Sequence, residues 1–589
     1  MNDCRFEIAP CPPEQVACLR RELGVSDALA QVLVRRGLGA PAAARAFLAA
    51  EEEHPPSAFR GIEEGVELVL RHLHGGERIT VHGDYDVDGI CSTAVLVRAL
   101  GALGADVDSY LPDRASDGYG LAAATVRRLA ERGTRLLITA DCAITAVAEV
   151  SLAKELGMEV LVTDHHAPRA DGALPQAPIV HPGLCGYPCT ELCATAVAHK
   201  LAQALYVAAG RDPDELREDL DLVALATIAD VVTLRGENRT LVRRGLRALA
   251  GTAKPGLRAL MSVARTEPAK VNERAVGFAL APRLNAAGRL YRADAGLELI
   301  LTDDPLRAAQ IAQELDAANS ERRQVELRIR YEAEAQLAEQ GERAAYVLAG
   351  EGWHPGVIGI VASRMVEQSG RPVVMLALEG ERAKGSGRSV EAFDLLAGLS
   401  ACAPLLTRYG GHRAAAGLEL ERANLAAFAA ALDAHAAGVL AAADPMDVER
   451  VDAIVAGQDL GMALAEELQS LAPFGRGNPT VSLMAADAVF ADARPMGEGK
   501  HVRFTVQSCG ARARAVAFGN GGRLAVEEGV PVEATFTLEV NEWNGVSEPR
   551  LVLRRAQPAA VAEAVVQEPA EPRIETHDER SELVLFALP

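Results

Sequence analysis

Short apolar stretches alternate with amphipathic stretches of helical periodicity between residues 61 and 250. The apolar stretches include RITV, RLLIT and EVLVT, and the helical ones include CSTAVLVRALGALG, AATVRRLAERG and AVAEVSLAKELG. Strand and helix in this order predict right-handed βαβ units and a parallel sheet covered on both faces. Ligands of such sheets bind beyond the carboxyl ends of the strands. We therefore expect the functional side chains to follow directly after the apolar stretches.

The pattern changes several times along the rest of the chain, and these changes predict a multidomain α/β protein. Residues 303–341 are charge-rich and almost free of glycine, with a sparse apolar row typical of a long, partly exposed helix. Residues 446–556 alternate apolar and polar positions, which predicts a small all-β barrel or sandwich. The expected segments are a helical lead-in (1–60), the parallel-sheet domain (61–250), a helical connector with the long bridging helix (251–341), a second α/β domain (342–445), the β-barrel (446–556) and a flexible tail (557–589).

Composition and charge exclude some classes of protein. Hydrophobic residues make up 49% of the 589 positions, which is typical of a globular chain and not of a disordered one. No apolar run approaches the roughly 20 residues of a membrane span, and the start lacks the order of a secretion signal, so we expect a cytoplasmic protein with no membrane segment. A net charge of -21 argues against a protein that coats nucleic acid through its general field. It does not exclude an enzyme whose acidic site holds cations.

Ten cysteines are spaced irregularly, which fits reduced thiols better than a disulfide framework. Their one local cluster holds Cys185, Cys189 and Cys193. Zinc sites usually show a closer cysteine pair and a distant second pair of ligands, so free thiols are the favoured interpretation and the role of the cluster stays open.

Acidic and imidazole side chains recur at the expected edge of the sheet. GDYDVDG follows RITV, ADC follows RLLIT, and DHH follows EVLVT. A single aspartate after a strand is most often a helix N-cap, but clustered carboxylates repel one another unless cations neutralise them. Oxygen ligands with one or two imidazoles suit Mg²⁺ or Mn²⁺. The candidate residues are His82, Asp84, Asp86, Asp88, Asp141, Asp164, His165, His166 and Asp230, the last of which ends the apolar run LDLVALATIAD.

Several motifs resemble one known superfamily. GDYDVDG, ITADCAI, VTDHHAP and ALATIADVV resemble motifs one to four of the DHH phosphoesterases, and YGGHRAAAG resembles their companion DHHA1 domain. PRLNAAGR, WHPGVIGIVASR, LAPFGRGNP and NEWNG narrow the resemblance to the bacterial exonucleases of this superfamily that are specific for single-stranded DNA. The resemblance spans about residues 10 to 556. It implies a parallel-sheet DHH domain, a long connecting helix, a second α/β domain of DHHA1 type and a C-terminal OB-like β-barrel.

The resemblance implies two divalent metal ions, Mn²⁺ or Mg²⁺, which in two-metal sites lie roughly 3.5–4 Å apart. His82 and Asp86 would hold the first ion, and Asp84 would support or complete that site. Asp141 would bridge the two ions.

The second ion would be held by Asp88, His165 and Asp230. His166 would face the scissile phosphate, and Asp164 would orient a histidine from behind. The catalytic set implied in this way is Asp84, Asp86, Asp88, Asp141, His165, His166 and Asp230.

Further positions match family motifs that hold the substrate. Arginine suits this task because its guanidinium binds a phosphate through two hydrogen bonds. His412 matches a DHHA1 histidine expected near the leaving nucleotide. The implied substrate-binding residues are Arg114, Arg283, Asn285, Arg289, Ser386, Arg388 and His412.

The resemblance implies a single-stranded-DNA-specific 5′-to-3′ exonuclease that releases 5′-mononucleotides in DNA repair and recombination. It also implies a monomer whose partners, besides single-stranded DNA, include a single-stranded-DNA-binding protein and a RecQ-type helicase. The residue pattern alone supports only phosphodiester hydrolysis. Residue 143 is alanine where the family usually has glycine, and we expect this to constrain the backbone near Asp141 only mildly.

Two other functions remain open. The first is a DHH phosphodiesterase for short oligonucleotides or cyclic dinucleotides, although such proteins look shorter and lack the OB-like domain. The second is a non-catalytic scaffold for DNA repair or replication. The intact set of acidic and histidine ligands weighs against the scaffold, because a protein without metals has no need to keep repelling carboxylates together.

Overall fold

The computed structural model describes residues 4–113, 120–169, 171–290, 294–441, 447–543 and 545–559. The chain divides into two compact units, residues 1–453 with 462–482, and residues 454–461 with 483–589. Residues 462–482 therefore pack with the first unit, although part of the second unit precedes them in the sequence. Arg114 and most of the tail expected at 557–589 lie outside the described residues.

A five-stranded parallel sheet forms the centre of the expected DHH domain. Its spatial order is β3, β2, β4, β5 and β6, and each neighbouring pair is parallel, as predicted. The strands are β2 (Ile79–His82), β3 (Val107–Tyr110), β4 (Leu136–Ala140), β5 (Glu159–Thr163) and β6 (Ile179–Val180). The helices around them are α4 (Ile62–His74), α5 (Val87–Ala102), α6 (Ala123–Glu131), α7 (Val147–Glu155) and α8 (Ala194–Ala208).

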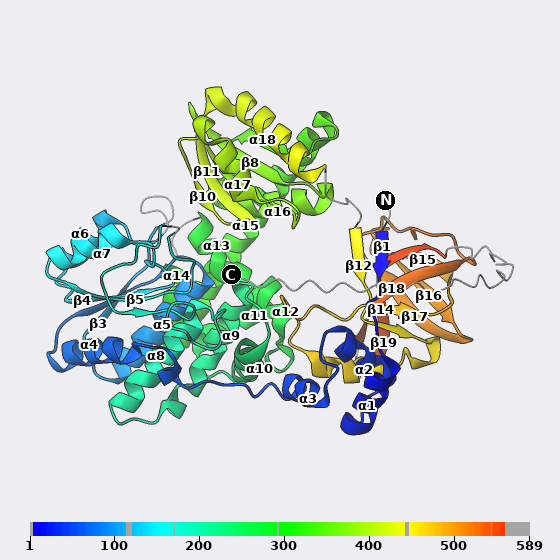
Figure 1. Ribbon diagram of the computed structural model, residues 1–589, viewed down its shortest axis with the longest axis horizontal. Coiled ribbons are helices and arrows are strands. Elements are labelled where there is room, and N and C mark those ends of the chain that lie inside the picture. The colour runs from blue at the N-terminus through cyan, green and yellow to red at the C-terminus, as the bar shows by residue number, and fades with distance from the viewer. Residues whose placement is uncertain are drawn as a thin grey trace, which may run out of the picture. The chain divides into compact units, whose positions relative to one another are not determined.

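Helices cover both faces of this sheet. Successive residues of a strand point to opposite faces. Leu136 and Ile138 of β4 accordingly join the core formed with α4, α5 and α8, whereas Leu137 joins the core formed with α6 and α7. Figure 1 shows α6 and α7 above the sheet and α4 and α8 below it. The helices cover the two faces, so the edge at the carboxyl ends of the strands is where polar residues can lie.

A helical segment follows the sheet. It carries Asp230 at the C-cap of its first helix and ends in a 36-residue helix, α15. The elements are α9 (Leu220–Ala229), α10 (Gly236–Ala250), α11 (Pro255–Val263), α12 (Glu273–Ala275), a π-helix η4 (Val276–Leu280), α13 (Ala281–Leu290), α14 (Asp294–Leu301) and α15 (Pro305–Gln340). Ile311 and Leu315 of α15 belong to the core of the DHH domain, and Ile329 and Ala333 belong to the next core along the chain. The predicted long connecting helix is thus confirmed.

The second α/β domain has a mixed five-stranded sheet, in which only β7 and β8 pair in parallel. Its strands are β7 (Tyr346–Glu351), β8 (Val373–Glu379), β9 (Arg382–Arg388), β10 (Arg408–Gly411) and β11 (Ala415–Glu421), and its helices are α16 (Pro355–Ser369), α17 (Leu395–Ala401) and α18 (Leu425–Leu440). The span Arg422–Leu440 is long and apolar enough to pass a length-and-composition test for a membrane helix, with a mean hydropathy of 1.3. Asp433 interrupts its apolar run, and Phe428 and Leu432 fill the core of the domain.

The N-terminal lead-in contains one short strand and three α-helices and attaches to the DHH domain through a buried arginine. Arg239 of α10 donates hydrogen bonds to the backbone oxygens of Phe47 at 3.0 Å and Leu471 at 2.8 Å. One side chain therefore holds both the lead-in and the 462–482 segment. These parts comprise β1 (Cys4–Glu7), α1 (Pro13–Leu23), α2 (Asp27–Arg35), α3 (Pro41–Ala49), β12 (Asp447–Arg450), which pairs with β1, and α19 (Met462–Leu468).

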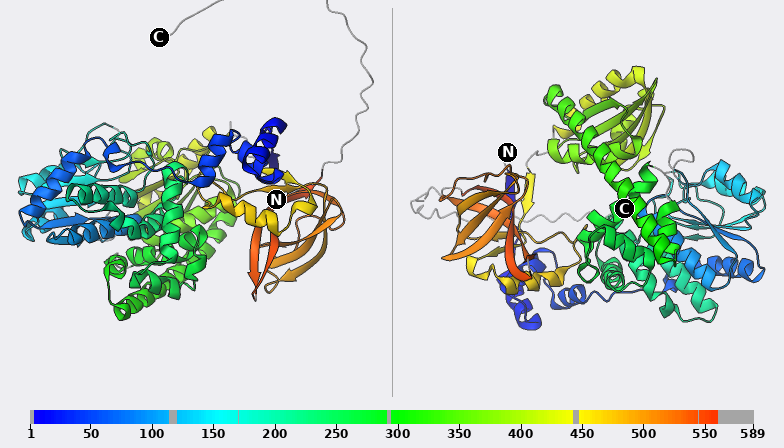
Figure 2. Two further views of the ribbon diagram at one scale, coloured as in Figure 1. Left: turned by 90° about the horizontal axis from the view of Figure 1, so that it is seen from below. Right: turned by 180° about the vertical axis from the view of Figure 1, so that it is seen from behind.

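The second unit is a curved seven-stranded sheet. Its order is β13, β14, β18, β15, β16, β17 and β19, and β18 also pairs with β19, which closes a barrel (Figure 2). The strands are β13 (Ala453–Val455), β14 (Leu483–Ala485), β15 (Ala488–Met496), β16 (His501–Ser508), β17 (Ala511–Ala517), β18 (Pro531–Trp543) and β19 (Val546–Pro558). Phe490 packs against Phe504 and Phe536 in its core. The predicted C-terminal β-barrel is confirmed.

Candidate metal centre

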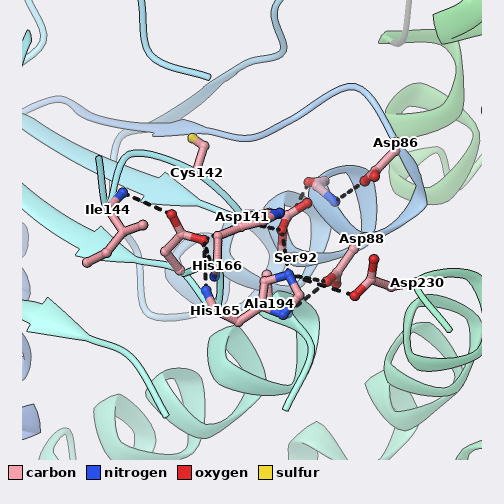
Figure 3. Close-up of polar contacts among 12 residues, drawn as sticks. Asp86, Asp88, Ser92, Asp141, Cys142, Ile144, His165, His166, Ala194 and Asp230 are labelled. Carbon is pink, nitrogen blue, oxygen red and sulfur yellow. Dashed lines mark hydrogen bonds and ion pairs between the residues drawn. The ribbon is translucent and has the colours of Figure 1, made fainter. Parts of the chain in front are cut away.

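The acidic and histidine residues gather where the strands of the parallel sheet end. His82 is the last residue of β2, and Asp141 and Asp164 directly follow β4 and β5. Asp86 is the N-cap of α5, where its carboxylate accepts a hydrogen bond from the Gly89 amide at 3.1 Å. Asp230 comes from the end of α9. Because the strands are parallel, the groups that follow them reach the same edge of the sheet. Figure 3 shows Asp86, Asp141 and Asp230 together at this place.

Among the described residues, three groups of ligand atoms lie close enough to share an ion, and two of these groups have no residue in common. The oxygens of Asp84, Asp86 and Asp141 form one group, with every atom within 4.8 Å of the others. A second group, with the same limit, is formed by Asp88, His165 and Asp230.

Asp141 lies between these two groups. Its Oδ1 is 3.2 Å from Nε2 of His165, and the two residues also form a ligand group with His166. This is the position that a bridging carboxylate needs, and the structure brings it about by joining the ends of β4 and β5.

The electrostatics of the site fit divalent cations. Burial, together with the charges of Asp88, Asp86, Asp84 and Asp164, raises the pKa of Asp141 well above its ordinary value. Burial and the charge of Asp88 raise the pKa of Asp230 to about 8. Oδ1 of Asp141 and Nε2 of His165 are buried without a hydrogen bond. Cations would relieve both the repulsion and the missing contacts, and this donor set suits Mn²⁺ or Mg²⁺.

His166 and Asp164 form a hydrogen-bonded pair behind the centre. Nδ1 of His166 lies 2.8 Å from Oδ1 of Asp164, whose other oxygen accepts the Ile144 amide at 2.9 Å. Burial disfavours the charged imidazole, but the hydrogen bond and charge of Asp164 outweigh burial and raise the pKa of His166 to about 9. The contact with Asp164 therefore favours the protonated form of His166.

The backbone around Asp141 and Asp230 is strained. Asp141 has φ 67° and Ala143 has φ 81°. Both lie in the left-handed backbone region, which residues other than glycine rarely adopt. Val231, directly after Asp230, has φ 57°, which is a genuine outlier for a β-branched residue. The expectation that Ala143 constrains the backbone only mildly was wrong, because a left-handed alanine costs roughly 1–2 kcal/mol. Strain of this kind clusters at functional sites.

Asp88 has a second task that its place in the motif does not reveal. Its oxygens accept hydrogen bonds from the amides of Ala194 and Thr195, each at 2.8 Å, and from the Thr195 hydroxyl at 2.6 Å. The carboxylate thus caps the N-terminus of α8. One oxygen still lies 3.7 Å from Nε2 of His165, so capping and a place in the second ligand group coexist.

His82 lies outside the ligand groups found among the described residues. It is fully buried and stacks on Tyr110, with ring centroids 5.5 Å apart. Its Nδ1 is 3.6 Å from Sγ of Cys142. The predicted role of His82 as a metal ligand thus stays a prediction, with less geometric support than the roles of Asp84, Asp86 and Asp141.

Three of the expected substrate-binding residues converge on the start of α16. Arg289 of α13 donates to the Gly356 oxygen at 3.0 Å, and Arg388 donates to Ser386 Oγ at 3.0 Å. A Cβ at Gly359 would lie 2.8 Å from Ser386 Oγ and 3.1 Å from an Arg388 nitrogen. Small residues in the first turns of α16 therefore leave room for Ser386 and Arg388 beside the helix.

The other expected substrate-binding residues lie apart from this cluster. Arg283 is mostly buried and pairs with Asp316 of α15 at 2.8 Å, a contact that occupies its guanidinium. Oδ1 of Asn285 accepts the Val87 amide at 3.1 Å, so Asn285 supports the loop of Asp84 and Asp86. His412 is exposed after β10.

The sequence motifs did not reveal several contacts of the site. The start of α8 had no signal in the sequence that would connect it to Asp88, more than 100 residues earlier. Arg476 lies in the quoted motif LAPFGRGNP, but nothing in the motif placed it near Asp230. The cysteines of the 185–193 cluster are separate free thiols among the described residues, and burial raises the pKa of all three.

Family models match three parts of the chain. The N-terminal domain of the DHH family matches residues 78–227, the DHHA1 domain matches 341–438, and the RecJ OB domain matches 451–555. Together with the fold and the acidic site, these matches define a DHH-family phosphoesterase with DHHA1 and OB domains.

Relatives narrow the class further. The single-stranded-DNA-specific exonuclease RecJ of Bacillus subtilis (strain 168) is 37% identical over 563 residues, covering 94% of this chain and 70% of the relative. RecJ of Thermus thermophilus is 38% identical over 504 residues, covering 85% of this chain and 72% of the relative. The chain belongs to the RecJ family.

Solved structures agree with this assignment. The crystal structure of RecJ in complex with Mn²⁺ from Thermus thermophilus is similar with a TM-score of 0.81 at 34% identity, covering 94% of this chain and 79% of that one. The crystal structure of RecJ from the same organism in complex with Mg²⁺ has a TM-score of 0.76 at 31% identity, with the same coverage.

Proposed function

We propose that this chain is a metal-dependent exonuclease that hydrolyses single-stranded DNA from the 5′ end and releases 5′-mononucleotides. The observation that carries the proposal is the pair of ligand groups that meet at Asp141 in a chain of the RecJ family. The substrate is that of the RecJ relatives. We also propose the expected six-segment domain division and a role in DNA repair and recombination.

In this proposal Asp84 and Asp86 would hold one ion, His165 and Asp230 would hold the other, and Asp141 would serve both. Bound divalent ions supply activation of the attacking water and neutralise charge on the transferred phosphoryl group. Asp88 would complete the second group while it fixes the start of α8, and His82 at the end of β2 would be a further ligand of the first ion, as the family motif implies.

His166 is the residue that would donate a hydrogen bond from its ring to the substrate. Because Nδ1 is held by Asp164, Nε2 is the nitrogen that would contact a phosphate oxygen. The raised pKa keeps this imidazole charged near neutral pH, which favours a hydrogen bond to an anionic oxygen. Arg289, Ser386 and Arg388 would hold the terminal phosphate beside α16 and so select the 5′ end.

The proposal is tested with the Asp141→Ala variant. Because Asp141 belongs to the first ligand group and its Oδ1 lies 3.2 Å from Nε2 of His165 in the second, its loss should lower the rate of hydrolysis by at least about 100-fold. Strand binding should stay close to that of the parent protein, since the phosphate contacts lie on other residues. The measurement follows 5′-labelled and 3′-labelled single strands, a duplex and a dinucleotide in Mn²⁺ and then in chelator.

The matched control is Asp214→Ala, which removes an exposed carboxylate of the same domain that pairs with exposed Arg217. It should cut as fast as the parent. Near-normal turnover by Asp141→Ala would contradict the bridging role. Preferred cleavage of the dinucleotide would favour the short-oligonucleotide phosphodiesterase, and strand binding without any cleavage in Mn²⁺ would favour the scaffold.

We also infer a cytoplasmic monomer that works with a single-stranded-DNA-binding protein and a RecQ-type helicase. Support for these partners comes from resemblance to the family alone. Pull-down of the two purified partners by the full chain tests the inference, and their failure to bind at micromolar concentration would contradict it.

A further inference from the structure

A tight turn at residues 475–478 packs against the chain just after Asp230. The amide of Leu234 donates to the Arg476 oxygen at 2.8 Å, and Nε of Arg235 donates to the Gly477 oxygen at 2.8 Å. Leu234 and Arg235 follow Asp230 by only four and five positions. The turn therefore lies beside the second ligand group although it is more than 240 residues away in sequence.

Hydrogen bonds of the Asn478 side chain fix the turn to the neighbouring chain. Nδ2 of Asn478 donates to the oxygens of Leu471 and Pro473, each at 2.8 Å, and Oδ1 of Asn478 accepts from Arg36 at 2.7 Å. The amides and oxygens of Gly475 and Asn478 pair with each other at 2.8 and 3.1 Å. Four residues thus form a fixed platform with Arg476 at its tip.

Glycines allow the turn to approach the chain after Asp230 so closely. A Cβ at Gly477, which has φ 77°, would lie 2.5 Å from Cγ2 of Thr233. A Cβ at Gly475 would lie 2.8 Å from Cδ1 of Leu234. The close approach is thus built into the backbone of the turn.

The side chain of Arg476 is exposed at this place. No hydrogen bond or ion pair engages its guanidinium within the described part of the chain, whereas most arginines around it are paired. Arg476 stands at the tip of a turn whose backbone contacts Leu234, four positions after Asp230. An unengaged guanidinium beside an acidic centre is suited to an anion that arrives with the substrate.

We propose that Arg476 binds a backbone phosphate of the single strand next to the ligand group of Asp88, His165 and Asp230. The inference rests on the proposed function and adds a substrate-binding residue that lies in the 462–482 segment. The rigid platform lowers the entropic cost of this contact, since only the side chain has to be ordered on binding. The alternative, that Arg476 acts only by tuning Asp230 and its metal, is an outcome of the test.

The test measures binding of a fluorescent single-stranded oligonucleotide in chelator, where no hydrolysis takes place, over a series of salt concentrations. For single strands, each phosphate contact contributes about 0.7 to the slope of log K against log salt concentration. Arg476→Ala should reduce this slope by about 0.7 and weaken binding by roughly five- to tenfold at low salt. Arg476→Lys should keep the slope of the parent, because the charge remains. Its affinity should lie between those of Arg476→Ala and the parent.

Arg247→Ala is the matched control, since it removes an exposed arginine near the end of α10 in the same unit. It should leave slope and affinity unchanged. A slope and affinity for Arg476→Ala equal to those of the parent would overturn the inference. A change in Mn²⁺ affinity by calorimetry without a change in the salt slope would overturn it as well, because Arg476 would then act through Asp230. A parent chain that neither binds nor cuts the strand would refute the proposed function, and the inference would fall with it.

Discussion

The pair of His166 and Asp164 links local geometry to the pH dependence of the site. Asp164 holds Nδ1 of His166 at 2.8 Å and raises the pKa of that imidazole to about 9, although burial acts in the opposite direction. A hydrogen bond from His166 to a phosphate oxygen requires the protonated ring. Activity should therefore fall as pH rises through the pKa of His166.

Asp164→Asn tests this at the level of a single residue. The amide oxygen can still accept the Ile144 amide, but the negative charge that raises the pKa of His166 is gone. We expect the high-pH fall of kcat/KM to begin at lower pH in the variant than in the parent. The measurement is a pH profile of kcat/KM in Mg²⁺. The control Asp171→Asn, which changes an exposed carboxylate paired with Arg169, should keep the parent profile. Identical profiles for the parent and Asp164→Asn would contradict the assigned role.

At the scale of elements, a buried ion pair joins α8 to α10. Nζ of Lys200 lies 2.8 Å from Oε1 of Glu237, and both side chains are almost fully buried. The carboxylate of Glu237 also accepts the His54 amide at 3.0 Å and the Tyr187 hydroxyl at 2.8 Å. The two helices and the end of the lead-in thus share one polar cluster.

Lys200→Met should destabilise the first unit by about 3–5 kcal/mol, because Glu237 is left as a buried charge without its partner. The double variant Lys200→Met with Glu237→Gln should be clearly more stable than Lys200→Met alone, since glutamine keeps the acceptor for His54 and carries no charge. Denaturant unfolding of the three proteins gives the comparison. A double variant less stable than the single one would show that the unpaired charge is not the main cost.

At the scale of the whole molecule, the acidic centre couples the stability of the first unit to pH and to cations. The pKa of Asp230 is raised to about 8 in the folded protein, far above its ordinary value of 3.8. Between roughly pH 4 and pH 8, the Asp230 carboxyl is therefore protonated in the folded state and ionised in the unfolded state, so unfolding releases a proton. The contribution of Asp230 to stability is present at low pH and is lost as pH rises through about 8. Asp141, whose pKa is also raised, acts in the same direction.

In chelator, the melting temperature of the first unit should therefore fall between roughly pH 6 and pH 8.5. Mn²⁺ should stabilise this unit most at the higher pH, where protons no longer compete for the carboxylates. At a concentration of about 100 times its dissociation constant, a bound ion adds about 2.7 kcal/mol. Thermal unfolding at three pH values, with and without Mn²⁺, measures both effects. A melting temperature in chelator that rises over this range, or a gain from Mn²⁺ that shrinks with pH, would contradict the coupling.

Much of the architecture follows from local sequence patterns. The apolar stretches that end at His82 and before Asp141 and Asp164 form parallel strands as predicted, because alternating strand and helix patterns leave few other arrangements. The residues after them share one edge for the same reason. The long helix and the C-terminal β-barrel were likewise predicted from the periodicity of apolar residues.

Other features depended on which side chains meet across the fold. Asp88 caps α8, Asn285 supports the loop at Val87, and Arg283 pairs with Asp316, each with a partner at least 33 positions away. The left-handed backbone at Ala143 was signalled only by the glycine that the family usually has there, and the sequence did not give the size of the strain.

The sequence by itself thus determined the class of fold, the order of its elements and the set of side chains at the sheet edge, since these depend on periodicity and on neighbours along the chain. Tertiary structure alone decided how the ligands divide into groups around Asp141, and that the turn of Arg476 packs against Leu234, four positions after Asp230. The physical reason is that hydrogen-bond partners and electrostatic neighbours are set by three-dimensional packing, which brings together residues whose local patterns carry no information about each other.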